Sequence, residues 1–292
     1  ETVAASGRFG GNGVESVVGH PMGSQVGYIA DGIFKSQEEI DNHAIRLSDA
    51  LIIRTRTQCN KELLNDTSVK VIATATIGTD HIDLDYCQQH NIEVRNAEGC
   101  NSRGVLQWVA AVLRHITLSD NKHPNDYTLG IVGVGNVGSL VSTYARHWGF
   151  NVMECDPPRK EREGGEFYPI EELARRCDIL TFHTPLDHAT HHLVDAQLLN
   201  SMRPETIILN ASRGGVVDNS ALAKSSHRYY FDVWENEPDI DPEVLTRATL
   251  ATPHVAGYSA QGKANATAMV VNAIAQHFGL TIANWYPTNI ER

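Results

Sequence analysis

A glycine-rich turn between an apolar run and an amphipathic stretch restricts the possible folds of this chain more than any other feature. Residues 128–149 read TLGIVGVGNVGSLVSTYARHWG, in which Gly133, Gly135 and Gly138 have the spacing G-x-G-x-x-G. The first glycine of such a unit permits a tight turn, the second lets a pyrophosphate approach the backbone, and the third lets the helix pack on the strand. The pyrophosphate then lies at the positive end of the helix. We therefore predict a strand–turn–helix unit that binds a dinucleotide.

An acidic residue at the end of the next apolar run indicates which dinucleotide is bound. Asp156 follows FNVMEC, where a carboxylate accepts hydrogen bonds from the ribose hydroxyls and repels a 2′-phosphate. NAD is therefore favoured over NADP, although the positive charge of Arg159 follows closely. The alternative is a structural β-α-β unit without a ligand. The predicted cofactor contacts from this stretch are Gly133, Gly135, Asn136, Val137, Gly138 and Asp156.

Short β-branched runs alternate with helical stretches along most of the chain. ALIIR (50–54), VKVIATA (69–75) and IEVRN (92–96) are typical of strands buried on both faces. Further strands are expected near 128–133, 150–155, 178–183, 206–211, 229–234 and 249–252. Strands that alternate with helices predict parallel sheets. Residues 1–35 are rich in glycine, and no strand is recognisable in residues 1–30.

Two long predicted helices, 100–119 and 259–278, flank the second set of strands. They suggest that the chain leaves a first domain and returns to it. We predict an α/β fold with two doubly wound parallel-sheet domains and a cleft between them. A Rossmann-type NAD-binding domain would comprise 100–269, with crossover helices at both ends. A flavodoxin-like substrate-binding domain would be discontinuous and comprise 1–99 and 270–292.

Composition excludes several classes of partner. The net charge of −11 argues against a nucleic acid, whose phosphates would be repelled. No apolar run approaches the roughly 18 residues of a membrane span, and the first residues do not resemble a signal peptide. The scattered cysteines form no C-x-x-C pair, so reduced thiols in a cytoplasm are expected. They are Cys59, Cys87, Cys100, Cys155 and Cys177.

The stretch HATHH, His188 to His192, could hold a metal ion. No cysteine or acidic residue lies at a spacing suited to complete the site. A polar loop is the favoured interpretation, and no metal is predicted.

Three chemically versatile residues follow predicted strands of the second region. Arg213 follows TIILNAS, Glu237 lies just beyond YYFDVW, and His254 follows LAT. Ligands of open α/β sheets bind beyond the carboxyl ends of the strands. Each residue also has a simpler interpretation: a surface ion-pairing arginine, a solvated loop acid and a turn histidine. Beside a dinucleotide site, however, the three together suit a hydride transfer coupled to a proton transfer.

The stretches GIVGVGNVG, DILTFHTPL, ILNASRGGVVDNSAL, FDVWENEP and TPHVAGYS carry a resemblance. Over nearly the whole second domain the chain resembles the D-isomer-specific 2-hydroxyacid dehydrogenase family. The resemblance implies that Arg213 binds the substrate carboxylate and polarises the C2 oxygen. It also implies that His254 is the acid/base and that Glu237 hydrogen-bonds its imidazole. These roles are chemically sound, since a neighbouring carboxylate raises a histidine pKa and a guanidinium fork fits a carboxylate.

Within the family, the first-domain stretches IIRTRTQCN (52–60), ATATIGTDHID (73–83) and EGCNS (98–102) indicate the substrate. Together with DPPR and GYSAQGKANAT they most resemble members that oxidise 4-phospho-D-erythronate with NAD in pyridoxine phosphate synthesis. The resemblance implies substrate contacts by Thr55, Thr76 and Tyr258, and NAD contacts by Thr184, Asp232 and Gly257. Independently, Arg54 and Arg56 end a predicted strand, where a phosphorylated substrate needs positive charge. Their alternative is that of ordinary surface arginines.

Other functions remain open at this point. Members acting on 3-phosphoglycerate, glyoxylate or hydroxypyruvate have the same catalytic residues, and a non-catalytic NAD-sensing protein is an alternative of another class. The resemblance implies a homodimer, but the carboxy-terminal dimerisation domain of many members is not recognisable after Gly279. The segment ALAKSSHRYYF (221–231) is shorter than the usual helix, turn and strand.

Overall fold

The computed structural model describes residues 18–19, 25–28, 45–46, 48–55, 57–282 and 284–287. The chain divides into two compact units: unit 1 is Glu1–Cys100 with Ala260–Arg292, and unit 2 is Asn101–Ser259. The sequence-based boundary at residue 270 falls inside the helix α11 (Ala260–His277) and differs from this division. The whole of α11 belongs to unit 1, because its buried Ala266, Val270 and Ile274 pack on strands of that unit.

Unit 2 is built on a six-stranded sheet in the order β11-β10-β9-β8-β6-β7. Its strands are β6 (Thr128–Val132), β7 (Asn151–Cys155), β8 (Ile179–Phe182), β9 (Ile207–Asn210), β10 (Arg228–Phe231) and β11 (Leu250–Ala251). All neighbouring pairs are parallel. From β6 the chain passes to β7 on one side and then to β8 on the other, so the strand order reverses at β6. Ligands of such sheets bind at the carboxyl ends beside the reversal.

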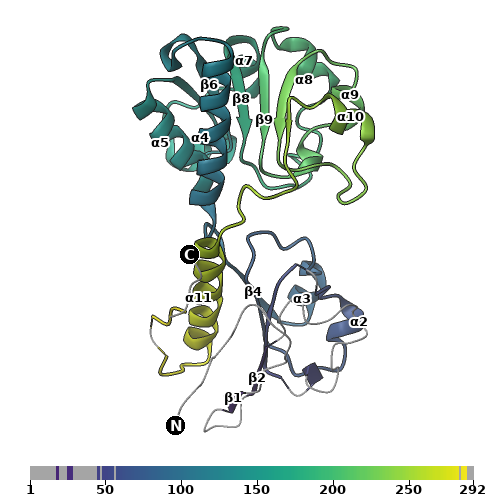
Figure 1. The fold of residues 1–292 in the computed structure, drawn as a ribbon. Coiled ribbons are helices and arrows are strands. Elements are labelled where there is room, and N and C mark those ends of the chain that lie inside the picture. Colours follow the sequence, from purple (N-terminus) through teal and green to yellow (C-terminus); the bar gives the residue numbers. More distant parts are fainter. Residues whose placement is uncertain are drawn as a thin grey trace. The chain divides into compact units, whose positions relative to one another are not determined.

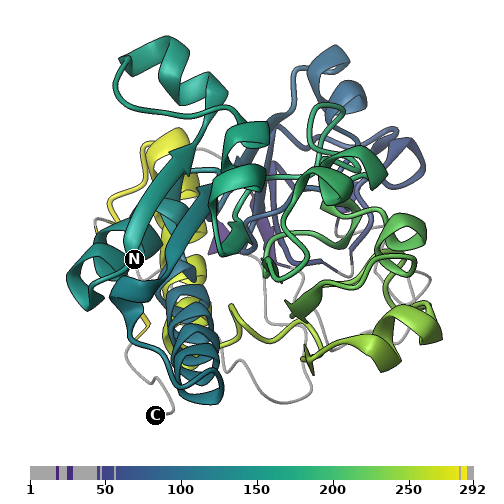
Figure 2. The ribbon, with the colours of Figure 1, turned by 90° about the horizontal axis from the view of Figure 1, so that it is seen from above.

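Helices cover both faces of this sheet, as Figures 1 and 2 show. One face carries α4 (Ser102–Ser119) and α5 (Asn136–Trp148), which pack on inward-pointing residues such as Leu129 and Ile131. The other carries α7 (Ile170–Arg176), α8 (Ala196–Ser201), α9 (Asn219–Leu222) and α10 (Pro242–Arg247), over residues such as Leu180 and Phe182. The helix α6 (Pro157–Glu163) follows β7. Each large apolar side chain buried in this way stabilises the fold by about 1.5–3 kcal/mol.

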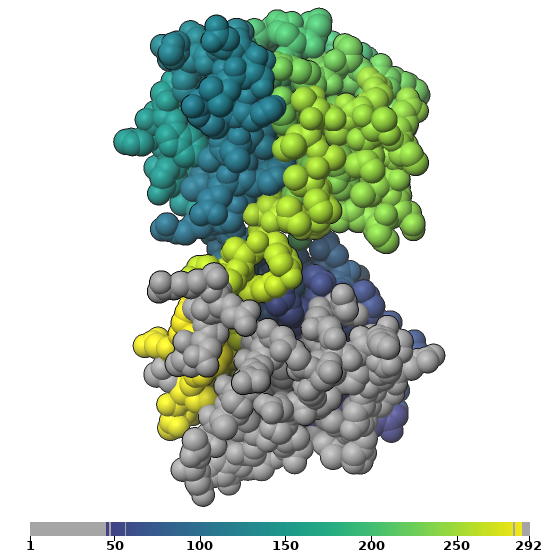
Figure 3. Space-filling view, in the orientation of Figure 1, coloured from purple at the N-terminus to yellow at the C-terminus, as the bar shows by residue number. Residues whose placement is uncertain are grey.

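The long helix α4 has the apolar stripe that the sequence predicts. Val105, Val109, Val112, Leu113 and Ile116 are all buried, at the three- and four-residue spacing of one helix face. The opposite side of the helix is exposed, at Arg103, Gln107, Ala111, Arg114 and Leu118, and α4 forms part of the surface of unit 2 in Figure 3. The helix ends where Asn121 adopts a positive φ of 52°, shortly before Pro124.

Unit 1 contains a five-stranded sheet in the order β1-β2-β3-β4-β5. The strands are β1 (Val18–Gly19), β2 (Gln25–Tyr28), β3 (Ala50–Ile53), β4 (Val71–Thr74) and β5 (Glu93–Asn96). The pair β1–β2 is antiparallel and the other pairs are parallel. No strand was recognisable in residues 1–30, but the described part of this segment contains β1 and β2, whose residues VG and QVGY form no continuous apolar run.

Both faces of the unit 1 sheet are covered by helices. The short helices α2 (Lys61–Leu64) and α3 (Leu84–Gln89) pack on one face with Leu51, Ile53 and Ile72. On the other face α11 packs with Ala50, Ile52 and Val71. Alternate residues of β3 and β4 therefore belong to different cores, which is why these two strands read as continuous apolar runs. The strand β5 was also expected to be buried on both faces, but its residues are half-buried or exposed. The predicted α/β class is confirmed.

Two further expectations concern single segments. The stretch 221–231 was expected to be too short for a helix, a turn and a strand, but it contains the end of α9, a turn and β10, because α9 is only four residues long. Among the described residues, no helix has the length and apolar character that crossing a membrane requires.

Candidate active site

The glycine turn at the end of β6 has the geometry that its spacing predicts. Gly133 has φ +84°, and a Cβ there would lie 2.8 Å from the carbonyl oxygen of His183. A Cβ on Gly138 would lie 1.9 Å from the Gly133 carbonyl oxygen, so only glycine lets α5 pack this close. A Cβ on Gly135 would meet nothing within 4 Å. The backbone at Gly135 is therefore open to a ligand at the amino end of α5, next to Asn136 and the half-buried Val137.

Asp156 ties the end of β7 to the glycine turn. Its Oδ2 accepts a hydrogen bond from the Val134 N–H at 2.8 Å, and its Oδ1 accepts one from the Arg159 N–H at 2.9 Å. The Arg159 guanidinium donates to the Val134 carbonyl at 2.9 Å and pairs with Glu163 at 2.7 Å. The positive charge that could have favoured NADP is thus paired with an acid. Each carboxylate oxygen has a second lone pair, so Asp156 keeps acceptor capacity.

Two buried polar atoms near the glycine turn and the 252–257 turn lack a hydrogen-bond partner among the described residues. They are Thr184 Oγ1 and Asn101 Oδ1. Thr184 follows β8 and lies against the glycine turn, since a Cβ on Gly133 would be 2.9 Å from its methyl group. Asn101 lies against Gly257, where a Cβ would be 2.0 Å from Asn101 Nδ2. Buried polar atoms are usually satisfied, so both are candidates for contact with a bound molecule.

The turn that bears Arg213 is held by a buried asparagine at the end of β9. Asn210 is fully buried; its Oδ1 accepts hydrogen bonds from the Ser212 N–H and Oγ, and its Nδ2 donates to the Arg213 carbonyl at 2.9 Å. The half-buried Arg213 side chain donates to the Ser212 carbonyl at 2.8 Å. Sequence reasoning missed Asn210, whose only signal is a polar residue that closes an apolar strand.

Glu237 and His254 form a hydrogen-bonded pair beyond the ends of β10 and β11. His254 Nδ1 lies 2.8 Å from Glu237 Oε2, and the His254 side chain is 51% exposed. The other carboxylate oxygen, Oε1, accepts the Trp234 N–H at 2.6 Å, which fixes the orientation of Glu237. Because Nδ1 faces the carboxylate, Nε2 of His254 is left for another partner. A histidine oriented in this way by a carboxylate is suited to carry a proton.

The charges around this pair shift both pKa values. The hydrogen bond that His254 donates to Glu237 is the main cause that raises the pKa of His254 above 6.5, against an opposing effect of burial. Burial by itself would raise the pKa of Glu237, but the hydrogen bonds from His254 and Trp234 outweigh it and lower the pKa below 4.5. The positive charge of Arg213 also lowers both pKa values. The structure therefore pairs two of the predicted catalytic residues, Glu237 and His254, within electrostatic range of the third, Arg213.

Asp232 holds the turn that carries His254. It is buried, and its carboxylate accepts the Val255 and Ala256 N–H groups at 2.8 and 2.7 Å. Its backbone carbonyl accepts the His254 N–H at 2.7 Å. These contacts help to hold His254 at a φ of +54°. A contact between Asp232 and NAD remains a prediction.

Another histidine of unit 2, also at the end of a strand, is unsuited to acid/base work. His183 follows β8, and its Nε2 lies 3.0 Å from Thr181 Oγ1. Burial lowers the pKa of His183 to about 3, so its ring stays neutral at physiological pH. The surroundings therefore give His254 and His183, two of the fourteen histidines of this chain, opposite pKa shifts.

The predicted substrate contacts lie at carboxyl ends of unit 1 strands and on one turn of unit 2. Arg54, half-buried, and Thr55, exposed, follow β3. Thr76 follows β4, where its Oγ1 lies 2.6 Å from Thr74 Oγ1 and donates to the Gly78 carbonyl. Because β3 and β4 are neighbouring parallel strands, these residues share one edge of the sheet. Tyr258, in unit 2, is 68% exposed, and Arg56 is outside the described residues.

Comparison with known proteins identifies the family of this fold and site. Residues 104–256 match the family model described as "D-isomer specific 2-hydroxyacid dehydrogenase, NAD binding domain". The chain belongs to this family. It is 45% identical to the erythronate-4-phosphate dehydrogenase of Bacteroides thetaiotaomicron over 264 residues, which are 87% of this chain and 76% of the relative. It is 39% identical to the enzyme of the same name from Pseudomonas fluorescens over 249 residues, 82% of this chain and 66% of the relative.

Solved structures of other 2-hydroxyacid dehydrogenases have the same fold. The chain is similar to NAD⁺-bound 3-phosphoglycerate dehydrogenase of Entamoeba histolytica, with a TM-score of 0.73, 25% identity and coverage of 88% of this chain and 87% of that one. It is also similar to D-lactate dehydrogenase of Aquifex aeolicus in complex with NAD and lactic acid, with a TM-score of 0.69, 22% identity and coverage of 83% and 87%.

As a 2-hydroxyacid dehydrogenase, the chain is an NAD-dependent oxidoreductase, and its glycine turn fits that cofactor. Gly135 offers open backbone at the amino end of a thirteen-residue helix, α5. Beside this turn lie the carboxylate of Asp156 and the unpartnered hydroxyl of Thr184. A pyrophosphate on the helix end and a ribose on Asp156 would use the available donors and acceptors.

Proposed function

We propose that this chain oxidises 4-phospho-D-erythronate at C2 to 2-oxo-3-hydroxy-4-phosphobutanoate, with reduction of NAD. The observation that carries the proposal is the 2.8 Å pair of His254 Nδ1 and Glu237 Oε2 beside Arg213, on the domain that bears the glycine turn. The choice of substrate follows the relatives named erythronate-4-phosphate dehydrogenase, at 39–45% identity. Such an enzyme takes part in pyridoxine phosphate synthesis.

Each residue of the proposed site has one role in the oxidation. Arg213 binds the substrate carboxylate through two parallel hydrogen bonds and draws electron density from the C2 hydroxyl oxygen. His254 Nε2 accepts the hydroxyl proton, and the resulting imidazolium is stabilised by Glu237. Bound NAD supplies the acceptor for the hydride that leaves C2. In reduction the imidazolium returns its proton to the same oxygen.

The phosphate of the substrate requires positive charge and hydrogen-bond donors. We assign this role to Arg54 with the hydroxyls of Thr55 and Thr76 from unit 1, and a further substrate contact to Tyr258. The half-buried position of Arg54 supports this assignment, because a partly desolvated guanidinium binds phosphate more strongly than a fully exposed one.

A substrate comparison with purified protein tests the proposal. NADH formation is followed by absorbance. The kcat/KM should be highest with 4-phospho-D-erythronate, and lower with 3-phosphoglycerate, D-lactate or glycerate. His254→Asn should lower kcat by at least about 100-fold, because general base catalysis contributes roughly 10²–10⁴-fold. The variant should still bind NAD with the affinity of the wild type.

Other results would favour the alternatives. Highest kcat/KM with 3-phosphoglycerate would assign the chain to the activity of its Entamoeba neighbour. Binding of NAD without turnover of any 2-hydroxy acid would favour a cofactor-sensing protein. Undiminished turnover by His254→Asn would remove the proposed acid/base.

We also propose a homodimer in the cytoplasm. The cytoplasm is supported by four buried cysteines that form no disulfide, Cys59, Cys87, Cys155 and Cys177. Burial raises the pKa of Cys59 to about 12 and that of Cys155 to about 11, so these thiols stay protonated and unreactive. Light scattering after size-exclusion chromatography measures the assembly.

A further inference from the structure

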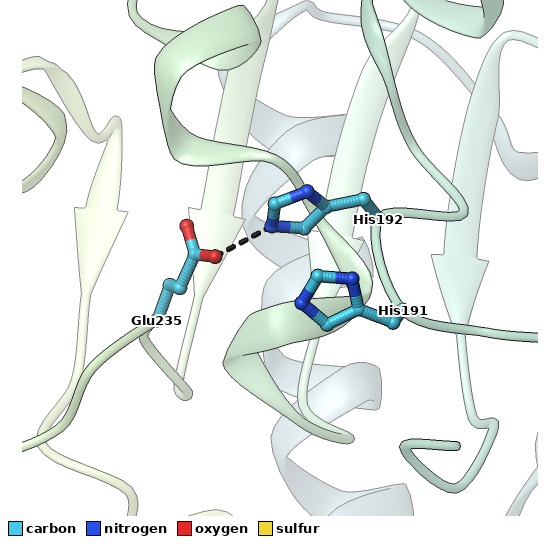
Figure 4. Close-up of side chains that lie close together, drawn as sticks. All are labelled: His191, His192 and Glu235. Carbon is cyan, nitrogen blue, oxygen red and sulfur yellow. Dashed lines mark hydrogen bonds and ion pairs between the residues drawn. The ribbon is translucent and has the colours of Figure 1, made fainter. Parts of the chain in front are cut away.

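A cluster of two histidines and one glutamate lies on unit 2 apart from the His254–Glu237 pair. His191 and His192 follow β8, and Glu235 follows β10 (Figure 4). His192 Nε2 lies 2.6 Å from Glu235 Oε1. The two imidazole rings are stacked, with centroids 3.9 Å apart and planes inclined by 24°. One ligand atom from each of the three residues lies within 4.8 Å of the others.

Neighbouring backbone groups fix the position of all three residues. The His192 N–H donates to the Gly215 carbonyl at 2.8 Å, and the His191 N–H donates to the Asp187 carbonyl at 2.8 Å. The second carboxylate oxygen of Glu235, Oε2, accepts the Asn219 N–H at 3.2 Å. Oε1 is thereby directed at the histidines. Ligands that are oriented in advance by outer hydrogen bonds bind metal ions more tightly.

The donor set selects a class of ion. Two imidazole nitrogens and one carboxylate oxygen suit Zn²⁺ and its late transition-metal neighbours, whereas Mg²⁺ and Ca²⁺ require oxygen ligands. Zinc binds imidazole nitrogen and carboxylate oxygen at about 2.0–2.2 Å, so two of its ligands lie at most about 4 Å apart. The three ligand atoms already lie within 4.8 Å of one another, and the exposed side chain of His191 has room to adjust to that range.

We propose that the His191–His192–Glu235 cluster binds a zinc-class divalent ion, with water in the open position. The ion replaces the proton that the His192–Glu235 hydrogen bond now shares. It joins the loops after β8 and β10. Because His192 contacts Gly215 and Glu235 contacts Asn219, the ion also stabilises the segment after β9. Gly215 lies two residues after Arg213. The proposal is independent of the dehydrogenase reaction, because no step of that reaction uses these three residues.

Calorimetric titration of the untagged, chelator-treated chain with ZnCl₂ tests the site. The wild type should bind one ion per chain. His191→Gln should weaken binding by at least about tenfold, the lower range for disturbed metal sites. His188→Gln is the matched control, since His188 is an exposed histidine of the same loop outside the cluster, and it should bind zinc as the wild type does. Glu235→Gln should resemble His191→Gln.

Additional measurements separate ligation from loss of fold and from the catalytic site. His191 is exposed, so His191→Gln should keep the melting temperature of the wild type without metal. Co²⁺ bound to the wild type should give a visible absorption band that His191→Gln lacks. His254→Asn should retain zinc binding. The proposal fails if the wild type binds no zinc, if His188→Gln and His191→Gln lose affinity equally, or if binding disappears with His254. These titrations contain neither NAD nor substrate, so they test zinc binding even if the chain has no dehydrogenase activity.

Discussion

The hydrogen bond between Glu237 and His254 should be visible in the pH dependence of the reaction. Oxidation needs the neutral imidazole, and Glu237 raises the pKa of His254. We expect kcat/KM for oxidation to rise with pH and to level off above a pKa higher than 6.5. Glu237→Gln should move that inflection to lower pH while lowering kcat, since the imidazolium formed in the reaction loses its partner. Rate profiles over pH 5–9 measure both effects.

The exposed Glu243 of α10 provides the control for this variant. Glu243→Gln changes the net charge by the same amount and should leave the inflection in place. An unchanged inflection in Glu237→Gln would show that another group sets the pKa of the acid/base. The same pair affects folding with a defined sign. The lowered pKa of Glu237 stabilises the fold above pH 4.5, and the raised pKa of His254 stabilises it below pH 6.5, so the contribution is greatest between these values.

At the residue scale, the sequence predicts proximity best where strand order decides position. Arg213, Glu237 and His254 follow parallel strands, and parallel strands end at one edge, so their approach could be foreseen. The partner of His192 could not be foreseen, because Glu235 lies 43 residues further along the chain. The contacts of Asp232 and Asn210 could not be predicted either, because both side chains bind backbone N–H groups of particular turns.

At the scale of an element, two glycines of the strand–turn–helix unit of β6 and α5 should have different roles, one in stability and the other in NAD binding. Gly138→Ala should lower the free energy of unfolding by about 1–3 kcal/mol, because its Cβ would collide with the Gly133 carbonyl. Gly135→Ala should stay within about 1 kcal/mol of the wild type, since nothing lies within 4 Å of a Cβ there. The same methyl group would occupy the space of a pyrophosphate, so NAD affinity should fall at least about tenfold.

Urea unfolding and NAD titration of the two variants measure these effects side by side. Each variant is the control of the other, since both replace glycine by alanine within one turn. Wild-type NAD affinity in Gly135→Ala would contradict the assigned position of the pyrophosphate. Wild-type stability in Gly138→Ala would contradict the close packing of α5 on the turn.

Elements were predictable to the extent that their side chains show a pattern. The inner strands have apolar residues on both faces because helices cover both, and α4 has its stripe because only one side is buried. The strands β1 and β2 were missed, since their residues VG and QVGY contain no continuous apolar run. The helix α11 was expected, but its assignment to unit 1 depends on packing against β3 and β4.

At the scale of the whole molecule, NAD binding should stabilise unit 2 and slow the hydrogen exchange of its amide groups. Free energy from a ligand that binds only the folded state equals RT ln(1 + [L]/Kd), or about 2.7 kcal/mol at 100 times Kd. Amide groups of unit 2 that exchange only by unfolding should therefore exchange roughly 100-fold more slowly with NAD at that concentration. Peptides covering β6 and the start of α5 should show additional protection, because the cofactor is assigned to their turn.

Mass-spectrometric hydrogen exchange with and without NAD makes the comparison, and Gly135→Ala at the same NAD concentration is the control. Equal exchange of these peptides in both conditions, at a saturating NAD concentration, would place the cofactor elsewhere.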